Sequence, residues 1–152
     1  MAGLDVDVKF FHTPKVEDDG VNVGWFEDQT YEDGLPVAKV ARWNEFGTKA
    51  GIPERPFMRR TMHKNQNKWI ELLKTLVQRE IDKDKGANID KALKKFGEIV
   101  KGDIQETILE GGFVKNARST ERRKGFNMPL VDTGVMISSI QARTDKELLE
   151  NV

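Results

Sequence analysis

The stretch that decides the fold runs from residue 56 to residue 111 and reads PFMRRTMHKNQNKWIELLKTLVQREIDKDKGANIDKALKKFGEIVKGDIQETILEG. Apolar residues recur in it at the spacing of one α-helix face, first before and then after a break near Lys85 and Gly86. The first stripe is Met58, Met62, Trp69, Leu73, Leu76, Val77 and Ile81, and the second is Ile89, Leu93, Phe96, Val100, Ile104 and Ile108. We therefore predict two long helices that pack antiparallel, with their stripes covered by each other and by a sheet.

The ends of the second helix carry recognisable signals. Asn88 is suited to the N-cap, and Asp90 lies in the first turn, where the helix dipole favours an acidic side chain. Gly111 and Gly112 are expected to end the helix.

A shorter helix is predicted before this hairpin. Val37, Val40, Ala41 and Asn44 have helical spacing behind Pro36, and Gly47 follows where a left-handed backbone would end the helix. Trp43 and Phe46 are expected on its exposed side.

Strands are predicted at both ends of the chain. Val6, Val8 and Phe10, and then Val21 and Val23, alternate with polar residues or glycine, which is typical of half-buried strands that pair with one another. After Pro129, either Asp132 or Thr133 is suited to cap a short helix through Ile140, with a strand beyond it. The predicted fold class is α+β, a single domain over residues 1–152 with a small antiparallel sheet against two long helices.

Composition limits the function. The 152 residues contain no cysteine, which excludes a thiol nucleophile, a zinc ribbon and a disulfide scaffold. The 25 basic and 25 acidic residues give zero net charge, which argues against a strongly basic nucleic-acid binder. The first 50 residues nonetheless hold ten acids against five bases, so the remainder carries the compensating positive charge. We predict two faces of opposite sign.

The sequence offers little for catalysis. His12 and His63 are far apart and have no metal-ligand spacing, and neither glycine-rich phosphate loops nor a Gly-x-Ser-x-Gly elbow is present. We therefore expect no enzyme activity, no metal and no cofactor. The start has neither the basic nor the apolar region of a secretory signal, and no apolar run is long enough to cross a membrane, so a cytoplasmic place of synthesis without a membrane partner is expected.

A basic loop at about 112–128 has few apolar residues and is predicted to be mobile. Its cations are Lys115, Arg118, Arg122, Arg123 and Lys124, with Phe113 and Phe126 near its ends. One interpretation is an arm that binds nucleic acid. The other is a loop whose charges meet an acidic protein surface, such as the one that residues 17–33 would supply.

Three further stretches occur in a characteristic order. They are VAKVARWNEFGT at residues 37–48, IPERPFMRR at 52–60 and PLVDTGVMISSI at 129–140. Together, over roughly residues 20 to 143, they resemble the tailed-bacteriophage neck and tail-completion proteins, the phage virion morphogenesis family. The resemblance implies a non-enzymatic α+β subunit of the virion that forms a homo-oligomeric ring, commonly sixfold, at the junction of head and tail.

The same resemblance implies the partners. They would be other copies of the chain, the head connector or neck proteins and the tail tube, with DNA passing transiently through the lumen. Members of the family act as tail terminators, as completion factors or as head–tail joining proteins, and the resemblance does not choose among these roles.

The candidate contact residues come from these motifs and from the basic loop. The candidates for a subunit or partner interface are Asn44, Glu45, Phe46, Arg55, Phe57, Arg59, Arg60, Lys115, Arg118, Arg122, Arg123 and Lys124. Residues with a motif or structural role are Gly47, Thr48, Pro53, Pro56, Leu130, Asp132, Thr133, Gly134, Ser139 and Ile140. Arg55, between the two prolines, is expected to be held ready for a carboxylate such as Glu45. Residues 44–48 fit either a helix end packed within its own subunit or a contact between subunits.

Overall fold

A computed structural model describes residues 19–83, 88–115 and 134–150 of the chain. The fold is α+β, as predicted. In chain order its elements are β1 (Val21–Gly24), α1 (Val37–Phe46), α2 (Phe57–Ile81), α3 (Ile89–Glu110), α5 (Val135–Ser138), β2 (Gln141–Thr144) and α6 (Asp145–Glu150).

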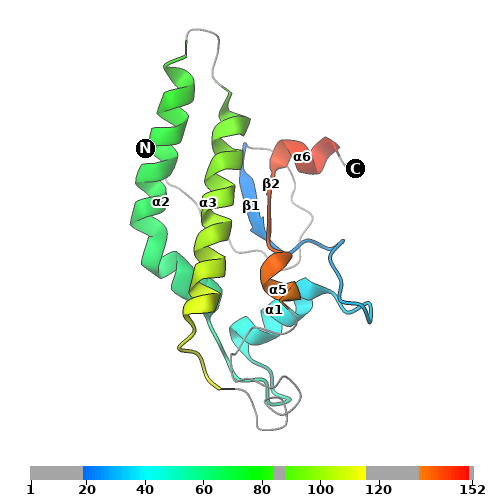
Figure 1. Cartoon of the computed structure of the whole chain (residues 1–152). Coiled ribbons are helices and arrows are strands. Elements are labelled where there is room, and N and C mark those ends of the chain that lie inside the picture. The colour runs from blue at the N-terminus through cyan, green and yellow to red at the C-terminus, as the bar shows by residue number, and fades with distance from the viewer. Residues whose placement is uncertain (1–18, 84–87, 116–133, 151–152) are drawn as a thin grey trace.

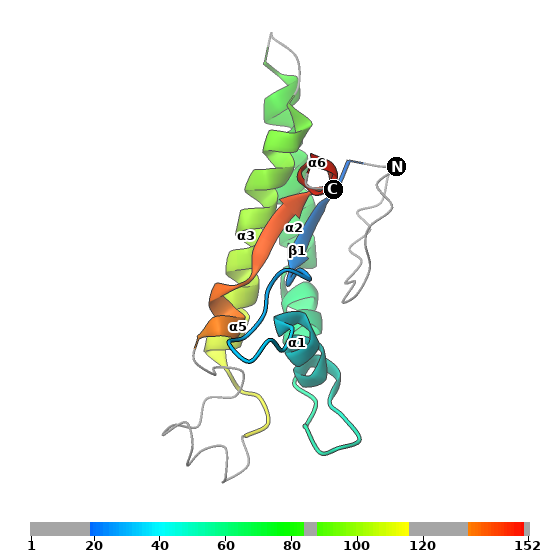
Figure 2. The same ribbon diagram turned by 90° about the vertical axis from the view of Figure 1, so that its right-hand side faces the viewer.

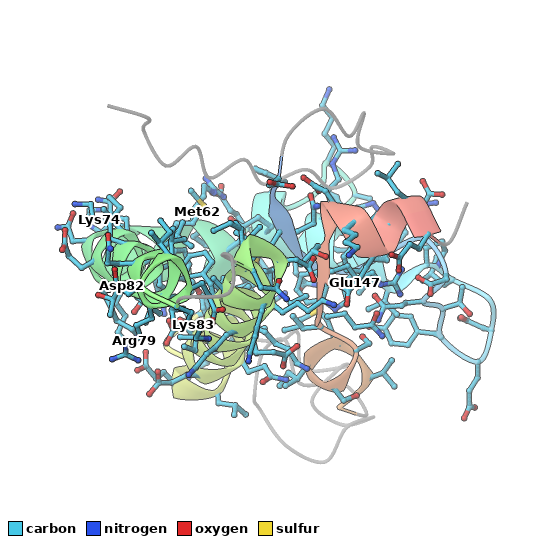
Figure 3. All side chains as sticks on the ribbon, turned by 90° about the horizontal axis from the view of Figure 1, so that it is seen from above. Met62, Lys74, Arg79, Asp82, Lys83 and Glu147 are labelled. Carbon is cyan, nitrogen blue, oxygen red and sulfur yellow. The ribbon has the colours of Figure 1, made fainter. Side chains whose placement is uncertain are left out.

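The two long helices α2 and α3 lie side by side and antiparallel, which confirms the central prediction (Figure 1). The sheet packs on α3, while α1 and α5 gather beside the end of the hairpin where α2 begins and α3 ends (Figures 1 and 2). Seen from above, Lys74 and Arg79 lie on the solvent side of α2, whereas Glu147, a residue of α6, lies near β2 (Figure 3).

Within the described residues the sheet has two antiparallel strands, β1 and β2, with Val21 opposite Thr144 and Gly24 opposite Gln141. The predicted pairing of the N-terminal and C-terminal strands is confirmed, while residues 6–10 lie outside the described part. The sheet approaches α3 closely at Gly97, where an added Cβ would lie 2.7 Å from Cγ2 of Val21.

The buried face of α2 differs from the predicted stripe. Its buried side chains include Thr61 and Asn65 besides Met58 and Trp69, whereas Ile81 is 54% exposed. Burial of these polar groups is tolerated because each donates to a backbone carbonyl four residues earlier. Thr61 Oγ1 reaches Phe57 O at 2.7 Å, and Asn65 Nδ2 reaches Thr61 O at 2.9 Å.

The ends of α3 follow the sequence signals. Asn88 Oδ1 accepts a hydrogen bond from Lys91 N at 3.0 Å, Asp90 lies in the first turn, and Gly111 and Gly112 both have positive φ after the last turn.

The C-terminal prediction needs correction. The N-cap of α5 is Gly134, in a left-handed conformation (φ 75°), and the helix ends at Ser138 instead of continuing through Ile140. The expected cap residues Asp132 and Thr133 lie outside the described residues. The predicted strand is present as β2, but the sequence analysis missed α6. This helix begins with a capping box, in which Thr144 N donates to Glu147 Oε2 at 2.9 Å and Glu147 N donates to Thr144 Oγ1 at 3.4 Å.

Candidate functional site

Residues 44–60 form a corner built around Glu45. They comprise the end of α1, the connecting segment and the first turn of α2. The Glu45 side chain is 0% exposed. Glu45 Oε2 accepts a hydrogen bond from Met58 N at 2.8 Å, and Oε1 accepts from Arg59 N at 3.2 Å and Arg59 Nε at 2.8 Å. Pro56, at the N-cap of α2, makes no side-chain cap. Glu45 therefore caps α2 from the preceding helix, where its negative charge also meets the positive end of the helix dipole.

Glu45, the carboxylate named as an example for Arg55, pairs with Arg59 instead. Arg55 is 5% exposed, and its guanidinium donates to Asn44 Oδ1 at 2.7 Å, to Val114 O at 2.9 Å and to Lys115 O at 3.3 Å. Burial lowers the pKa of this guanidinium. Arg55 lies two residues before Phe57, the first residue of α2, and its guanidinium reaches the residues that follow α3, whereas Arg59 reaches the carboxylate of Glu45. The pairing raises the pKa of Arg59, first through Glu45 and then through Glu54.

Arg60 completes the attachment of residues 111–115, the stem of the predicted basic loop. Its guanidinium donates to Gly111 O at 2.6 Å and to Gly112 O at 3.4 Å, and it lies 3.9 Å from the ring centroid of Phe113. Arg55 and Arg60 together hold the stem against the start of α2. The other cations of the basic loop, Arg118, Arg122, Arg123 and Lys124, lie outside the described residues.

Gly47 and Thr48 make the turn of the corner. Gly47 has φ 69° and ψ 178°, so the predicted positive φ is present, but with an extended ψ in place of the left-handed helical one. An added Cβ at Gly47 would lie 3.0 Å from both Glu54 N and Ile52 O. Thr48 pairs with Ile52 through Thr48 N to Ile52 O at 2.9 Å and Ile52 N to Thr48 Oγ1 at 3.1 Å. The backbone therefore requires glycine at position 47.

The three motif stretches meet at this end of the molecule. The first two are joined by Asn44 and Arg55, and α5 of the third lies against α1 (Figure 2). The third is also held by the loop after β1, because Trp25 Nε1 donates to Met136 O at 2.8 Å and Gln29 Nε2 donates to Ser139 O. Residues that are far apart in the sequence thus form one unit.

Several candidate contact residues are internal. Phe57 is 0% exposed and meets the Trp25 ring edge-on at 5.7 Å, while Asn44 and Glu45 serve the corner itself. Of the motif residues, Ile140 is buried and Pro53 and Pro56 are half-buried, whereas Leu130 lies outside the described residues. The described contacts of residues 44, 45, 47 and 48 lie within the subunit and are those expected of a packed helix end.

Arg59, Lys64 and Lys68, basic residues in the first half of α2, each pair with a carboxylate. Arg59 pairs with Glu45 and Glu54, Lys64 Nζ lies 2.6 Å from Glu110 Oε1, and Lys68 Nζ lies 2.7 Å from Asp103 Oδ1. These three cations therefore do not supply the predicted positive face, and most of the basic loop, its other expected part, lies outside the described residues.

The outer side of α1 carries a surface of which only Phe46 was among the predicted contact residues, although Trp43 was also expected on the exposed side. Lys39, Arg42, Trp43 and Phe46, the outer stripe of α1, line with Gly47 an open depression of about 520 Å³. Phe46 is 51% exposed, and Lys39 Nζ lies 5.1 Å from the Trp43 ring centroid. A second depression, of about 430 Å³, adjoins it at Phe46 and includes Lys49 and Ile52. The residues of the stripe have i, i+3, i+4, i+7 spacing, which places them on one face of the helix. The same spacing had indicated a different face, that of Val37, Val40, Ala41 and Asn44.

Comparison with protein-family models, with curated proteins and with solved structures gives no match. Among the described residues, no group of histidine and acidic side chains has the arrangement of a metal site. No helix within these residues is long and apolar enough to span a membrane.

Proposed function

We propose that this chain is a structural subunit of a tailed-phage neck that forms a homo-oligomeric ring, completes the tail and joins it to the head connector, with DNA passing through the lumen. The observation that carries the proposal is the convergence of the three motif stretches at one end of the fold. Residues 37–48, 52–60 and the described part of 129–140 build a single corner with α1 and α5 around it.

The contacts of the corner suit a subunit that must keep its shape while partners bind. A buried carboxylate caps α2, and Arg55 fastens the stem of the basic loop through two backbone carbonyls. Such contacts fix the position of the exposed outer stripe of α1. A closed ring needs two different surfaces that recognise each other, and a fixed geometry at each surface keeps the rotation between neighbouring subunits constant.

The proposal is tested in particles. Phage made without this chain is expected to accumulate separate heads and tails, and the purified full chain should restore joined particles when it is added to them. Electron microscopy of the restored particles, with the chain carrying a tag for labelling, should place the label at the neck. Normal particles made in the absence of the chain would contradict the proposal.

A second candidate function is nucleic-acid binding through residues 115–124. It is favoured by the exposed Lys115 on a stem that Arg55 and Arg60 hold in place. Binding to a labelled DNA duplex should then fall steeply with salt, and Arg122→Glu with Arg123→Glu should abolish it. Salt-independent or absent binding would exclude this function.

A further inference from the structure

The loop between β1 and α1 carries an exposed acidic knob, residues 27–34. Its acidic side chains are Glu27, Asp28, Glu32 and Asp33, all exposed. Asp28 is paired with Arg143 at 2.7 Å, so the charge offered to a partner comes mainly from Glu27, Glu32 and Asp33. The knob projects from the body of the molecule beside α1 (Figure 1).

Backbone hydrogen bonds hold the knob in shape. Tyr31 N donates to Leu35 O at 2.9 Å, Gly34 N donates to Tyr31 O at 2.9 Å, and Val37 N donates to Gln29 O at 3.0 Å. These bonds fix the knob at the N-terminal end of α1, whereas the outer stripe of α1 runs along the helix to its C-terminal end.

The outer stripe of α1 has the opposite character. Lys39 and Arg42 supply positive charge, and Trp43 and Phe46 supply aromatic surface around the depression of about 520 Å³. Phe46 is 51% exposed and Trp43 is half-buried. Aromatic and arginine side chains are enriched at the centre of protein interfaces.

We propose that the outer stripe of α1 in one subunit binds the acidic knob of the next copy. This inference rests on the proposed function, since it gives the ring its two unlike surfaces. Knob and stripe lie at different places on the same chain, so a contact between them is heterologous and repeats from copy to copy. Opposite charges set the register of the contact, and the two aromatic side chains supply the apolar area.

The first experiment uses the absence of native cysteine. Thr30→Cys marks the knob, and Ala50→Cys marks the turn beside the end of the stripe; both positions are exposed. Full-length chains that carry one substitution each, one of them tagged, are mixed and treated with a short bis-maleimide. A cross-linked pair should form at well above the yield from Thr30→Cys mixed with Ile81→Cys, whose exposed cysteine lies at the far end of α2. A yield equal to this collision background would overturn the proposal.

The second experiment reverses the charges. Lys39→Glu with Arg42→Glu reverses the stripe, and Glu27→Lys with Glu32→Lys reverses the knob. Each reversal alone should lower the cross-link yield roughly tenfold. The cross-link yield should recover when one chain carries the reversed stripe with Ala50→Cys and the other carries the reversed knob with Thr30→Cys. Misfolded variants would not show this recovery. Unchanged yields for the single reversals, or no recovery in the mixture, would overturn the contact.

Two further outcomes separate the contact from the proposed function. If the specific cross-link forms but the chain does not join heads to tails, the contact stands and the neck function is wrong. If joining requires the chain but the cross-link stays at background, the function stands and the contact is wrong. Binding of a DNA duplex that the reversed stripe abolishes, with cross-linking at background, would assign the stripe to nucleic acid and overturn the proposal.

Discussion

Gly97→Ala is expected to destabilise the protein although it places a better helix former in the middle of α3. Gly97 faces the sheet, and an added Cβ would lie 2.7 Å from Val21 Cγ2 and 2.8 Å from Ala142 Cβ. The Val21 side chain has a terminal methyl group that can turn away. The Cβ of Ala142 is attached directly to the backbone of β2, so relief there requires the strand itself to move.

The packing cost of the added methyl group at position 97 can be isolated by comparison with a matched control in the same helix. Gly102 lies on the exposed side of α3, and nothing lies within 4 Å of an added Cβ there. Both substitutions gain about 1 kcal/mol in helix propensity. Only Gly97→Ala overpacks the contact with the sheet, which costs about 1–3 kcal/mol. The difference between the two variants isolates this packing cost, because the propensity gain cancels.

Urea unfolding followed by circular dichroism measures the difference. Gly102→Ala should raise the midpoint and Gly97→Ala should lie below it by the equivalent of about 1–3 kcal/mol, with the same dependence on denaturant. In a thermal scan the melting temperatures should differ by several degrees, given about 2–4 °C per kcal/mol for a domain of this size. Equal stability of the two variants would refute the close approach of the sheet to α3 at Gly97.

Three other substitutions test the corner and the C-terminus. Glu45→Gln should lower the free energy of unfolding by about 1.5–3 kcal/mol, because it removes the charged acceptor that caps α2. The control Glu54→Gln, at an exposed ion pair, should change this free energy by less than about 0.5 kcal/mol. Equal effects of the two substitutions would refute the cap. Arg55→Lys should speed hydrogen exchange of the stem amides, since a single ammonium cannot span both Asn44 Oδ1 and the carbonyls of Val114 and Lys115. Unchanged exchange would show that Arg55 does not hold the stem. A hydrogen bond from Thr144 Oγ1 at 2.6 Å holds the pKa of Asp90 below its ordinary value, so this stabilisation is present at neutral pH and is lost as the pH falls below about 4. Thr144→Val should lower stability at neutral pH and flatten this part of the acid dependence; parallel pH profiles for the two proteins would contradict the assignment.

Local signals predicted much of this fold. The stripe of α3, its Asn88 cap and its terminal glycines are local features, and each is where the sequence indicated. The capping box from Thr144 to Glu147 was also present in the sequence and would have identified α6.

Contacts between distant residues could not be predicted in this way. The cap that Glu45 supplies to α2 comes from a different helix, so no spacing rule within α2 reveals it. Thr61 and Asn65 were absent from the predicted apolar stripe because they are polar. Their burial is possible because each donates a hydrogen bond to a backbone carbonyl of the same helix, and hydropathy does not show this. Arg55 also donates to the amide oxygen of Asn44 and to the carbonyls of Val114 and Lys115, which become its neighbours only after folding, so no spacing rule reveals these contacts.

The helix α1 is where local pattern and fold disagree most clearly. Its inner face buries the small residues Val37, Ala38 and Ala41 together with Glu45, while the larger aromatic residues of the outer stripe face outward. Stability alone would favour the opposite arrangement, because aromatic side chains gain the most from burial. Small inner residues let α1 lie close to the rest of the corner, and the half-exposed Phe46 ring and the half-buried Trp43 ring then lie on its outer side. Where a natural sequence departs from the pattern that local stability favours, the position is usually a functional or strained site. This disagreement therefore favours a binding surface at the outer stripe of α1. The arginines of the corner are less suited to that role, because their described contacts are internal.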